Sequence, residues 1–273
     1  SYVYCAGATT RKVWQLDPAD MSKVAESIAY GGTIKALIAD ASHIYCAGFT
    51  TKKVWQLDPA DMSVVAESIA YYGNLNALTV DGSHIYTGGV LTNKVWQIDP
   101  SDMSVVAESD VYGDGITALA ADASHIYCGG YTVQKVWQID PADMSKVAES
   151  RAYGGDLRAL TTDNSHVYCG GHVTNKVWQL APNDMSKVAE SLTYGDTIRA
   201  LIVGPDVAGG PTPITGTGAV ATQPAAVAAT GAQTFSGTAA VAAQPAAVAG
   251  AGTYTPLAIT GTGALSAQAA AIA

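Results

Sequence analysis

The chain has 273 residues, of which 48% are hydrophobic and 14% are charged, and its net charge at pH 7 is −9. This much apolar material excludes a charge-rich disordered chain. The acidic balance gives none of the positive potential that binding to nucleic acid or to an anionic membrane surface requires. No run of 18 consecutive apolar residues occurs, so the sequence predicts no membrane-spanning helix.

Five copies of a 41-residue unit fill the chain as far as Pro205. The period is set by the tryptophans, which are Trp14, Trp55, Trp96, Trp137 and Trp178. Five methionines and five tyrosines recur at the same spacing. A period of 20 to 50 residues is typical of solenoids, propellers and other repeat architectures.

Each unit has the pattern of four short strands. In the second unit the predicted strands are residues 42–48, 53–59, 64–68 and 74–81. These runs are rich in β-branched and aromatic residues and are bounded by Gly, Pro, Asp and Ser, which are strand and turn signals. The segment Asp17-Pro18-Ala19-Asp20 favours a type I turn, and Asp81-Gly82 favours a tight hairpin.

A 41-residue unit of four strands resembles the blade of a β-propeller of the WD40 or a related kind, although the Gly-His and Trp-Asp signatures of WD40 itself are missing. Five units with none left over also resemble the five-bladed ring of the tachylectin type, without a motif of that family. The resemblance implies an all-β, five-bladed propeller over residues 1–205. Residues 197–203 repeat the innermost strand of a blade, so the ring is expected to close with one blade built from residues 1–30 and 197–203, three strands from one end and one from the other.

Residues 206–273 are rich in alanine and glycine, and Asp206 is their only charged residue. A weaker repeat is visible at 214–231, 235–252 and 259–273. It predicts short β-hairpins of small side chains that bury little apolar area each, so assembly with other copies or subunits must supply the missing burial. A flexible linker is the alternative. The third copy is cut short, which predicts a tail that continues beyond Ala273. Such segments look similar to parts of phage tail and virion-appendage proteins and of some bacterial surface proteins.

Residue types that often carry chemistry recur at fixed positions of the unit, and each has a structural interpretation. The cysteines, predicted to be buried small residues, are Cys5, Cys46, Cys128 and Cys169. The periodic histidines, predicted to be structural, are His43, His84, His125 and His166. The Asp-Pro-x-Asp segments are predicted to cap turns. No motif for a metal, a cofactor or a catalytic nucleophile is present, so the sequence predicts no cofactor and no enzyme.

The five units differ mainly in two loops, which share one rim in a propeller. In a blade the strand equivalent to residues 42–48 is the second one. One loop joins this second strand to the third, for example Tyr131–Gln134 and His172–Asn175, and the other crosses from one unit to the next. Aromatic rings beside Asn, Asp and Gly stack on sugars and hydrogen-bond their hydroxyl groups. The predicted ligand-binding residues of this variable rim are Tyr30, Phe49, Tyr71, Tyr112, Tyr131, Tyr153, His172 and Tyr194. The alternative is that the tyrosines pack between the blades.

Near-identical units argue against catalysis, which needs unlike groups that converge, and favour multivalent binding. The sequence therefore predicts a non-enzymatic binding or structural module of an extracellular assembly, such as a phage tail fibre or virion appendage, that presents a rim for a glycan or host receptor. Other subunits would bind through the tail. The alternatives are a purely structural decoration or scaffold subunit, a bacterial lectin-like adhesin, and an enzyme with an asymmetric site near His172. The ligand, the host particle and the oligomeric state stay open.

Overall fold

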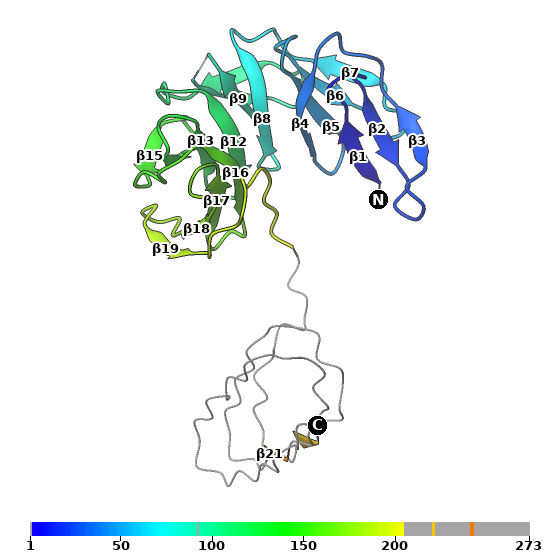
Figure 1. Ribbon diagram of the computed structural model, residues 1–273. Coiled ribbons are helices and arrows are strands. Elements are labelled where there is room, and N and C mark those ends of the chain that lie inside the picture. The colour runs from blue at the N-terminus through cyan, green and yellow to red at the C-terminus, as the bar shows by residue number, and fades with distance from the viewer. Residues whose placement is uncertain (1, 92, 205–219, 222–240, 243–273) are drawn as a thin grey trace. The chain divides into compact units, whose positions relative to one another are not determined.

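The computed structural model describes residues 2–91, 93–204, 220–221 and 241–242. The chain divides into two units after Val203, two residues before the boundary predicted at Pro205. In residues 2–204, with Thr92 left out, every regular element is a β-strand (Figure 1). Within the described residues, no helix has the length and apolar character that crossing a bilayer requires.

Five antiparallel sheets follow one another along the first unit (Figure 1). Sheet 1 holds β1 (Val3–Ala6), β2 (Val13–Leu16) and β3 (Lys23–Glu26). Sheet 2 holds β4 (Ile34–Ala39), β5 (Ile44–Gly48), β6 (Val54–Leu57) and β7 (Val64–Glu67). Sheet 3 holds β8 (Asn74–Val80), β9 (Ile85–Val90), β10 (Val95–Ile98) and β11 (Val105–Glu108). Sheet 4 holds β12 (Ile116–Ala121), β13 (Ile126–Gly130), β14 (Val136–Ile139) and β15 (Lys146–Glu149). Sheet 5 holds β16 (Leu157–Thr162), β17 (Val167–Gly171), β18 (Val177–Leu180) and β19 (Lys187–Glu190).

The turns between the third and fourth strands have the predicted chemistry. In sheet 2 the carboxylate of Asp58 accepts a hydrogen bond from the backbone N–H of Ala60 at 2.7 Å, and Asp61 accepts one from Ser63 at 2.8 Å. Met62 closes the turn in the left-handed region, with φ of 63°. The aspartates therefore cap the turn, as the sequence predicted. The Met62 side chain at the end of the turn is part of the buried cluster between sheets 1 and 2.

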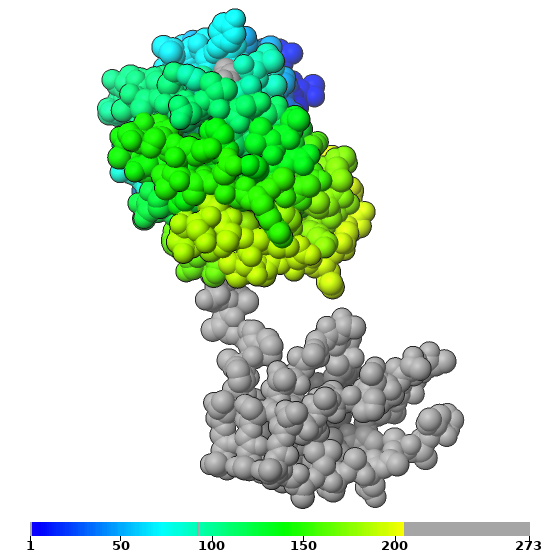
Figure 2. Space-filling view, turned by 90° about the vertical axis from the view of Figure 1, so that its left-hand side faces the viewer, coloured from blue at the N-terminus to red at the C-terminus, as the bar shows by residue number. Residues whose placement is uncertain are grey.

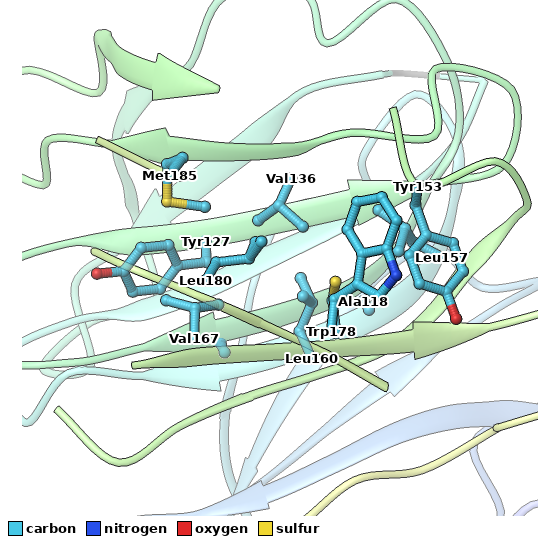
Figure 3. Close-up of a cluster of buried hydrophobic side chains, with 12 residues drawn as sticks. Ala118, Tyr127, Val136, Tyr153, Leu157, Leu160, Val167, Trp178, Leu180 and Met185 are labelled. Atoms are coloured by element: carbon cyan, nitrogen blue, oxygen red, sulfur yellow. The ribbon is translucent and has the colours of Figure 1, made fainter. Parts of the chain in front are cut away.

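The core lies between successive sheets. Figure 3 shows the cluster between sheets 4 and 5, where Tyr127 and Val136 of sheet 4 lie close to Trp178, Leu180 and Met185 of sheet 5. Equivalent clusters join the other neighbouring sheets. Figure 2 shows the sheets as successive bands of colour packed against one another. Because each unit buries its faces against the units before and after it, one unit alone has no core.

A series of hydrogen-bonded polar side chains also links each sheet to the next. The carboxylate of Asp81 accepts a hydrogen bond from the Tyr86 hydroxyl at 2.7 Å, and Gln97 Nε2 donates both to that hydroxyl at 3.2 Å and to the carbonyl of Pro141 in the next sheet at 3.0 Å. The same glutamine-to-proline bond recurs at the three other junctions, from Gln15 to Pro59, from Gln56 to Pro100 and from Gln138 to Pro182. Each sheet therefore has a fixed register on its neighbour.

The all-β, five-bladed repeat architecture is thus confirmed, with one difference at its ends. Sheet 1 has three strands, and residues 197–203, which were expected to supply its fourth, form no strand. The backbone N–H of Ile198 instead donates to the carbonyl of Gly171 in sheet 5, at 3.1 Å. This bond holds the start of the segment on sheet 5, and sheets 1 and 5 lie at opposite ends of a curved array (Figure 1).

The second unit is described at two short strands. β20 (Val220–Ala221) and β21 (Val241–Ala242) pair in parallel, with Val220 opposite Val241. These valines are equivalent positions of the first two tail repeats. The pair is parallel, whereas hairpins are antiparallel; the remainder of the predicted hairpins lies outside the described residues.

Candidate functional site

Hydrogen bonds hold the two variable loops side by side. The backbone N–H of Tyr71, in the crossing between sheets 2 and 3, donates to the carbonyl of Lys52, which ends the loop between β5 and β6. Equivalent bonds recur in every unit, from Tyr30 to Arg11, Tyr112 to Asn93, Tyr153 to Gln134 and Tyr194 to Asn175. The two loop types therefore share one rim, as the sequence predicted.

Four of the predicted ligand-binding tyrosines are part of the core. Tyr30, Tyr71, Tyr112 and Tyr153 are buried, and each packs against the tryptophan of the following sheet. The ring centroids of Tyr30 and Trp55 are 4.5 Å apart, and those of Tyr153 and Trp178 are 4.9 Å apart. Burial raises the pKa of Tyr71 to about 12, so this phenol stays neutral. These four positions follow the alternative interpretation, packing between blades, because a tyrosine ring that is at most 5% exposed has no face left for a ligand.

The other four predicted residues, Phe49, Tyr131, His172 and Tyr194, are half-buried or exposed on the rim. Two of them pair with a cation. Lys35 Nζ lies 5.6 Å from the ring centroid of Phe49, and the Arg158 guanidinium lies 5.2 Å from that of Tyr131. The second pair bridges two sheets, because Tyr131 follows β13 of sheet 4 and Arg158 is part of β16 of sheet 5.

A cluster of four unlike side chains forms around this second pair. Arg158 Nη2 donates to Asp156 Oδ2 at 3.1 Å, and His172 Nδ1 lies 3.8 Å from the same oxygen. The backbone N–H of His172 also bonds the carbonyl of Asp156, at 3.0 Å. We call Tyr131, Asp156, Arg158 and His172 the rim cluster. It combines a cation, an anion, an imidazole and an aromatic ring within reach of solvent.

The rim cluster interrupts the repeat. The positions equivalent to Asp156 hold Thr33, Asn74, Gly115 and Thr197 in the other units. Those equivalent to His172 hold Ala8, Phe49, Val90 and Tyr131. Sequence reasoning found Tyr131 and His172 but missed Asp156 and Arg158. The signal was available, because both lie where the crossing enters a sheet, a segment that varies among the units.

The remaining candidate residues have structural environments. Cys46, Cys128 and Cys169 are buried, and burial raises the pKa of Cys46 and of Cys169 to about 12, which suppresses the thiolate at neutral pH. The periodic histidines are half-buried, and in sheets 2 to 5 each of their rings lies 6.2 or 6.3 Å from that of the tyrosine two residues on. Among the described residues no three His, Cys, Asp or Glu side chains are grouped as a metal site would require.

No protein-family model and no curated protein matches the chain. Its fold is similar to solved structures of repeat proteins. The crystal structure of the computationally designed Ika8 protein matches with a TM-score of 0.66 and 11% identity, over 75% of this chain and 63% of that one. The WD40 repeats of RRP9 match with a TM-score of 0.64 and 11% identity, over 70% of this chain and 60% of that one. The chain thus spans about three fifths of the length of these structures. The likeness defines a propeller-like repeat fold and concerns the fold alone.

Proposed function

We propose that this chain is a non-enzymatic binding module of an extracellular assembly, and that its variable rim binds a glycan or a glycan-bearing receptor. The rim cluster is the observation that carries the proposal. The sheets repeat with little change, while Tyr131, Asp156, Arg158 and His172 form a combination that occurs once.

The chemistry of the rim cluster suits a sugar. The guanidinium and imidazole donate hydrogen bonds, the carboxylate accepts them, and the Tyr131 ring offers a surface on which a pyranose stacks. The ion pair between Arg158 and Asp156 orients both groups before a ligand arrives, which lowers the entropic cost of binding. The same groups contain no activated nucleophile, which is consistent with binding and not catalysis.

The setting of the module is part of the proposal. The repetitive tail is similar in composition to parts of phage tail and virion-appendage proteins, and this likeness is the reason we propose a virion or cell surface as the setting, with other subunits as partners. A purely structural subunit is the second candidate function. The observation that favours it is the exposure of apolar side chains at both ends of the sheet array, where Met21 and Tyr194 lie.

The test is a glycan array probed with the full chain at high surface density. We expect binding to a related set of sugars, and we expect Arg158→Ala to weaken it by a factor of about 10 to 100, the loss typical of one charged hydrogen bond. Tyr72→Ala is the matched control, because Tyr72 is the most exposed rim tyrosine and lies outside the rim cluster. If Arg158→Ala binds as the parent does, or if the folded parent binds no glycan, the proposed site is wrong.

A further inference from the structure

The two ends of the sheet array expose residues that every internal junction buries. Met21 in sheet 1 is 57% exposed. Its four equivalents, Met62, Met103, Met144 and Met185, are each 1% exposed. Tyr194, beyond sheet 5, is 55% exposed, whereas its equivalents are at most 5% exposed. Within the part of the chain that the structure describes, the face of sheet 1 and the face of sheet 5 therefore lack the neighbour against which internal sheets pack.

Sheet 1 also lacks its inner strand. In sheet 2 that strand is β4, which pairs with β5 in a register that places Leu37 opposite Cys46 and Ile38 opposite Tyr45. Among the described residues no strand pairs with this edge of β1, and there a row of backbone N–H and C=O groups is open to pairing.

The missing strand has a counterpart at the other end of the chain. Residues 198–203 are the fifth repeat of the β4 sequence. Their first residue already has the position of an inner strand, because Ile198 packs on Gly170 of sheet 5 as Ile116 packs on Gly88 of sheet 3. Beyond it the segment is open, and Ile202 is 90% exposed. The start of the segment, at Ile198, contacts sheet 5, at the position where a following sheet would begin.

We propose that residues 198–203 of one copy pair with β1 of a second copy, which completes the first sheet of that copy to four strands. The repeat fixes the register: Leu201 lies opposite Cys5, and Ile202 lies opposite Tyr4. Met21 of the second copy then packs on sheet 5 of the first, and Gln179 gains the carbonyl of Pro18 as its acceptor. This is strand addition at an open sheet edge.

A second copy fits this face better than the same chain does. Sheets 1 and 5 of one chain lie at opposite ends of the array (Figure 1). The array also superposes on 63% and 60% of longer repeat structures, so five sheets follow only part of such an arrangement. Because the two faces differ, the contact is head-to-tail, and it repeats from copy to copy into a ring or a filament.

A cysteine at position 201 tests both the register and the copy that supplies the strand. Among the four free cysteines, Cys46, Cys128 and Cys169 are buried and Cys5 is half-buried, so Cys5 is the accessible partner. We expect the full-length Leu201→Cys chain to form disulfide-linked dimers and larger species on mild oxidation, because directly opposite residues have Cβ atoms about 4.5–5.5 Å apart. Ile202→Cys is the control, since successive side chains of a strand point to opposite faces. A disulfide within one chain would overturn the proposal in favour of closure on itself. Cross-linking no greater than in the control would overturn the pairing altogether.

A second variant tests the apolar face without touching the strand. Met21→Asp should leave the fold unchanged, because the side chain is 57% exposed in a single copy. We expect light scattering to show that the unmodified chain self-associates and that Met21→Asp raises the dissociation constant by a factor of roughly 10 or more, since burying an unpaired carboxylate is unfavourable. A parent that stays at 27.9 kDa at all concentrations, or a variant that associates as the parent does, would contradict the proposal.

Discussion

The environment of a residue in this protein depends on which units flank it as much as on its type. Tyr112 and Tyr194 occupy the same position of the repeat, yet Tyr112 packs on Trp137 with ring centroids 4.9 Å apart, while Tyr194 is 55% exposed and has no sheet beyond it among the described residues. The repeat therefore supplies its own matched controls. A substitution at an internal unit and the same substitution at a terminal unit differ mainly in the neighbour.

We expect Tyr112→Ala to lower the free energy of unfolding by about 3–5 kcal/mol, the usual loss for a buried aromatic side chain. Tyr194→Ala should change it by no more than about 0.5 kcal/mol, as is usual for exposed positions. Urea unfolding followed by tryptophan fluorescence measures both. Equal losses in the two variants would show that Tyr112 does not have the packing described.

The aspartates that cap the hairpins make stability depend on pH. Burial raises the pKa of Asp81. Hydrogen bonds from the Tyr86 hydroxyl and from the backbone N–H groups of His84 and Ser83 lower this pKa, and together they outweigh burial, so the pKa of Asp81 is below its ordinary value. The pKa values of Asp40 and Asp163 are lowered in the same way. A carboxyl whose pKa is lowered by folding stabilises the protein above its unfolded pKa and loses that contribution as the pH falls through the folded pKa.

We therefore expect the urea midpoint to fall as the pH drops below about 4, the ordinary range of an aspartate. Tyr86→Phe removes one of the hydrogen bonds that lower the Asp81 pKa, so it should reduce the slope of this acid dependence. Urea titrations at several acidic pH values check both expectations. A midpoint that does not change over this range would contradict the assignment.

At the scale of the elements, each junction between neighbouring sheets has two components. One is an apolar cluster, and the other is the polar link, a hydrogen bond from a glutamine to a proline carbonyl of the next sheet. Gln97 is buried and donates to Tyr86 and to Pro141 of the next sheet. Gln179, its equivalent in sheet 5, is half-buried, and no sheet of the described residues follows it. The polar link should matter only where a neighbour exists.

Gln97→Ala should lower the free energy of unfolding by about 1–3 kcal/mol, because it removes a buried side chain that donates to the Tyr86 hydroxyl and to the half-buried carbonyl of Pro141. Gln179→Ala should have a much smaller effect. Thermal unfolding of the two variants side by side makes the comparison. If both melt alike, the glutamine does not act through the neighbouring sheet.

The strands and turns were predictable because they are local. Two-residue alternation and the Asp-Pro-x-Asp turns locate β5 to β8 to within two residues of the structure. The burial of Tyr30 and its equivalents was left open, because it depends on how a crossing loop packs on the next sheet, which no pattern within one unit specifies. Arg158 and Asp156, although they lie in a segment that varies among the units, were missed because their partners Tyr131 and His172 come close to them only in the folded chain.

At the scale of the whole molecule, the repeated sheets form a frame and the rim carries the differences. Each sheet is held by the same packing and the same polar link, so variation at the loops leaves the frame intact. This division of roles is typical of repeat proteins, in which loops on one face serve recognition. Met21 and Leu201, which carry the proposed assembly, lie outside the rim cluster, so assembly and ligand binding can be tested with different variants.

The most direct test of the central claim, that recognition lies in the rim and not in the frame, is a loop exchange. The sequence of Ala8–Arg11 replaces that of Tyr131–Gln134, which has the same length and the same left-handed final residue, with φ of 58° at Arg11 and 57° at Gln134. The fold should therefore be retained, as an unchanged urea midpoint would show. On a glycan array, the account predicts that the exchanged chain loses binding by roughly tenfold or more, as expected when a stacking ring is removed. A folded, exchanged chain that binds as the parent does would contradict it.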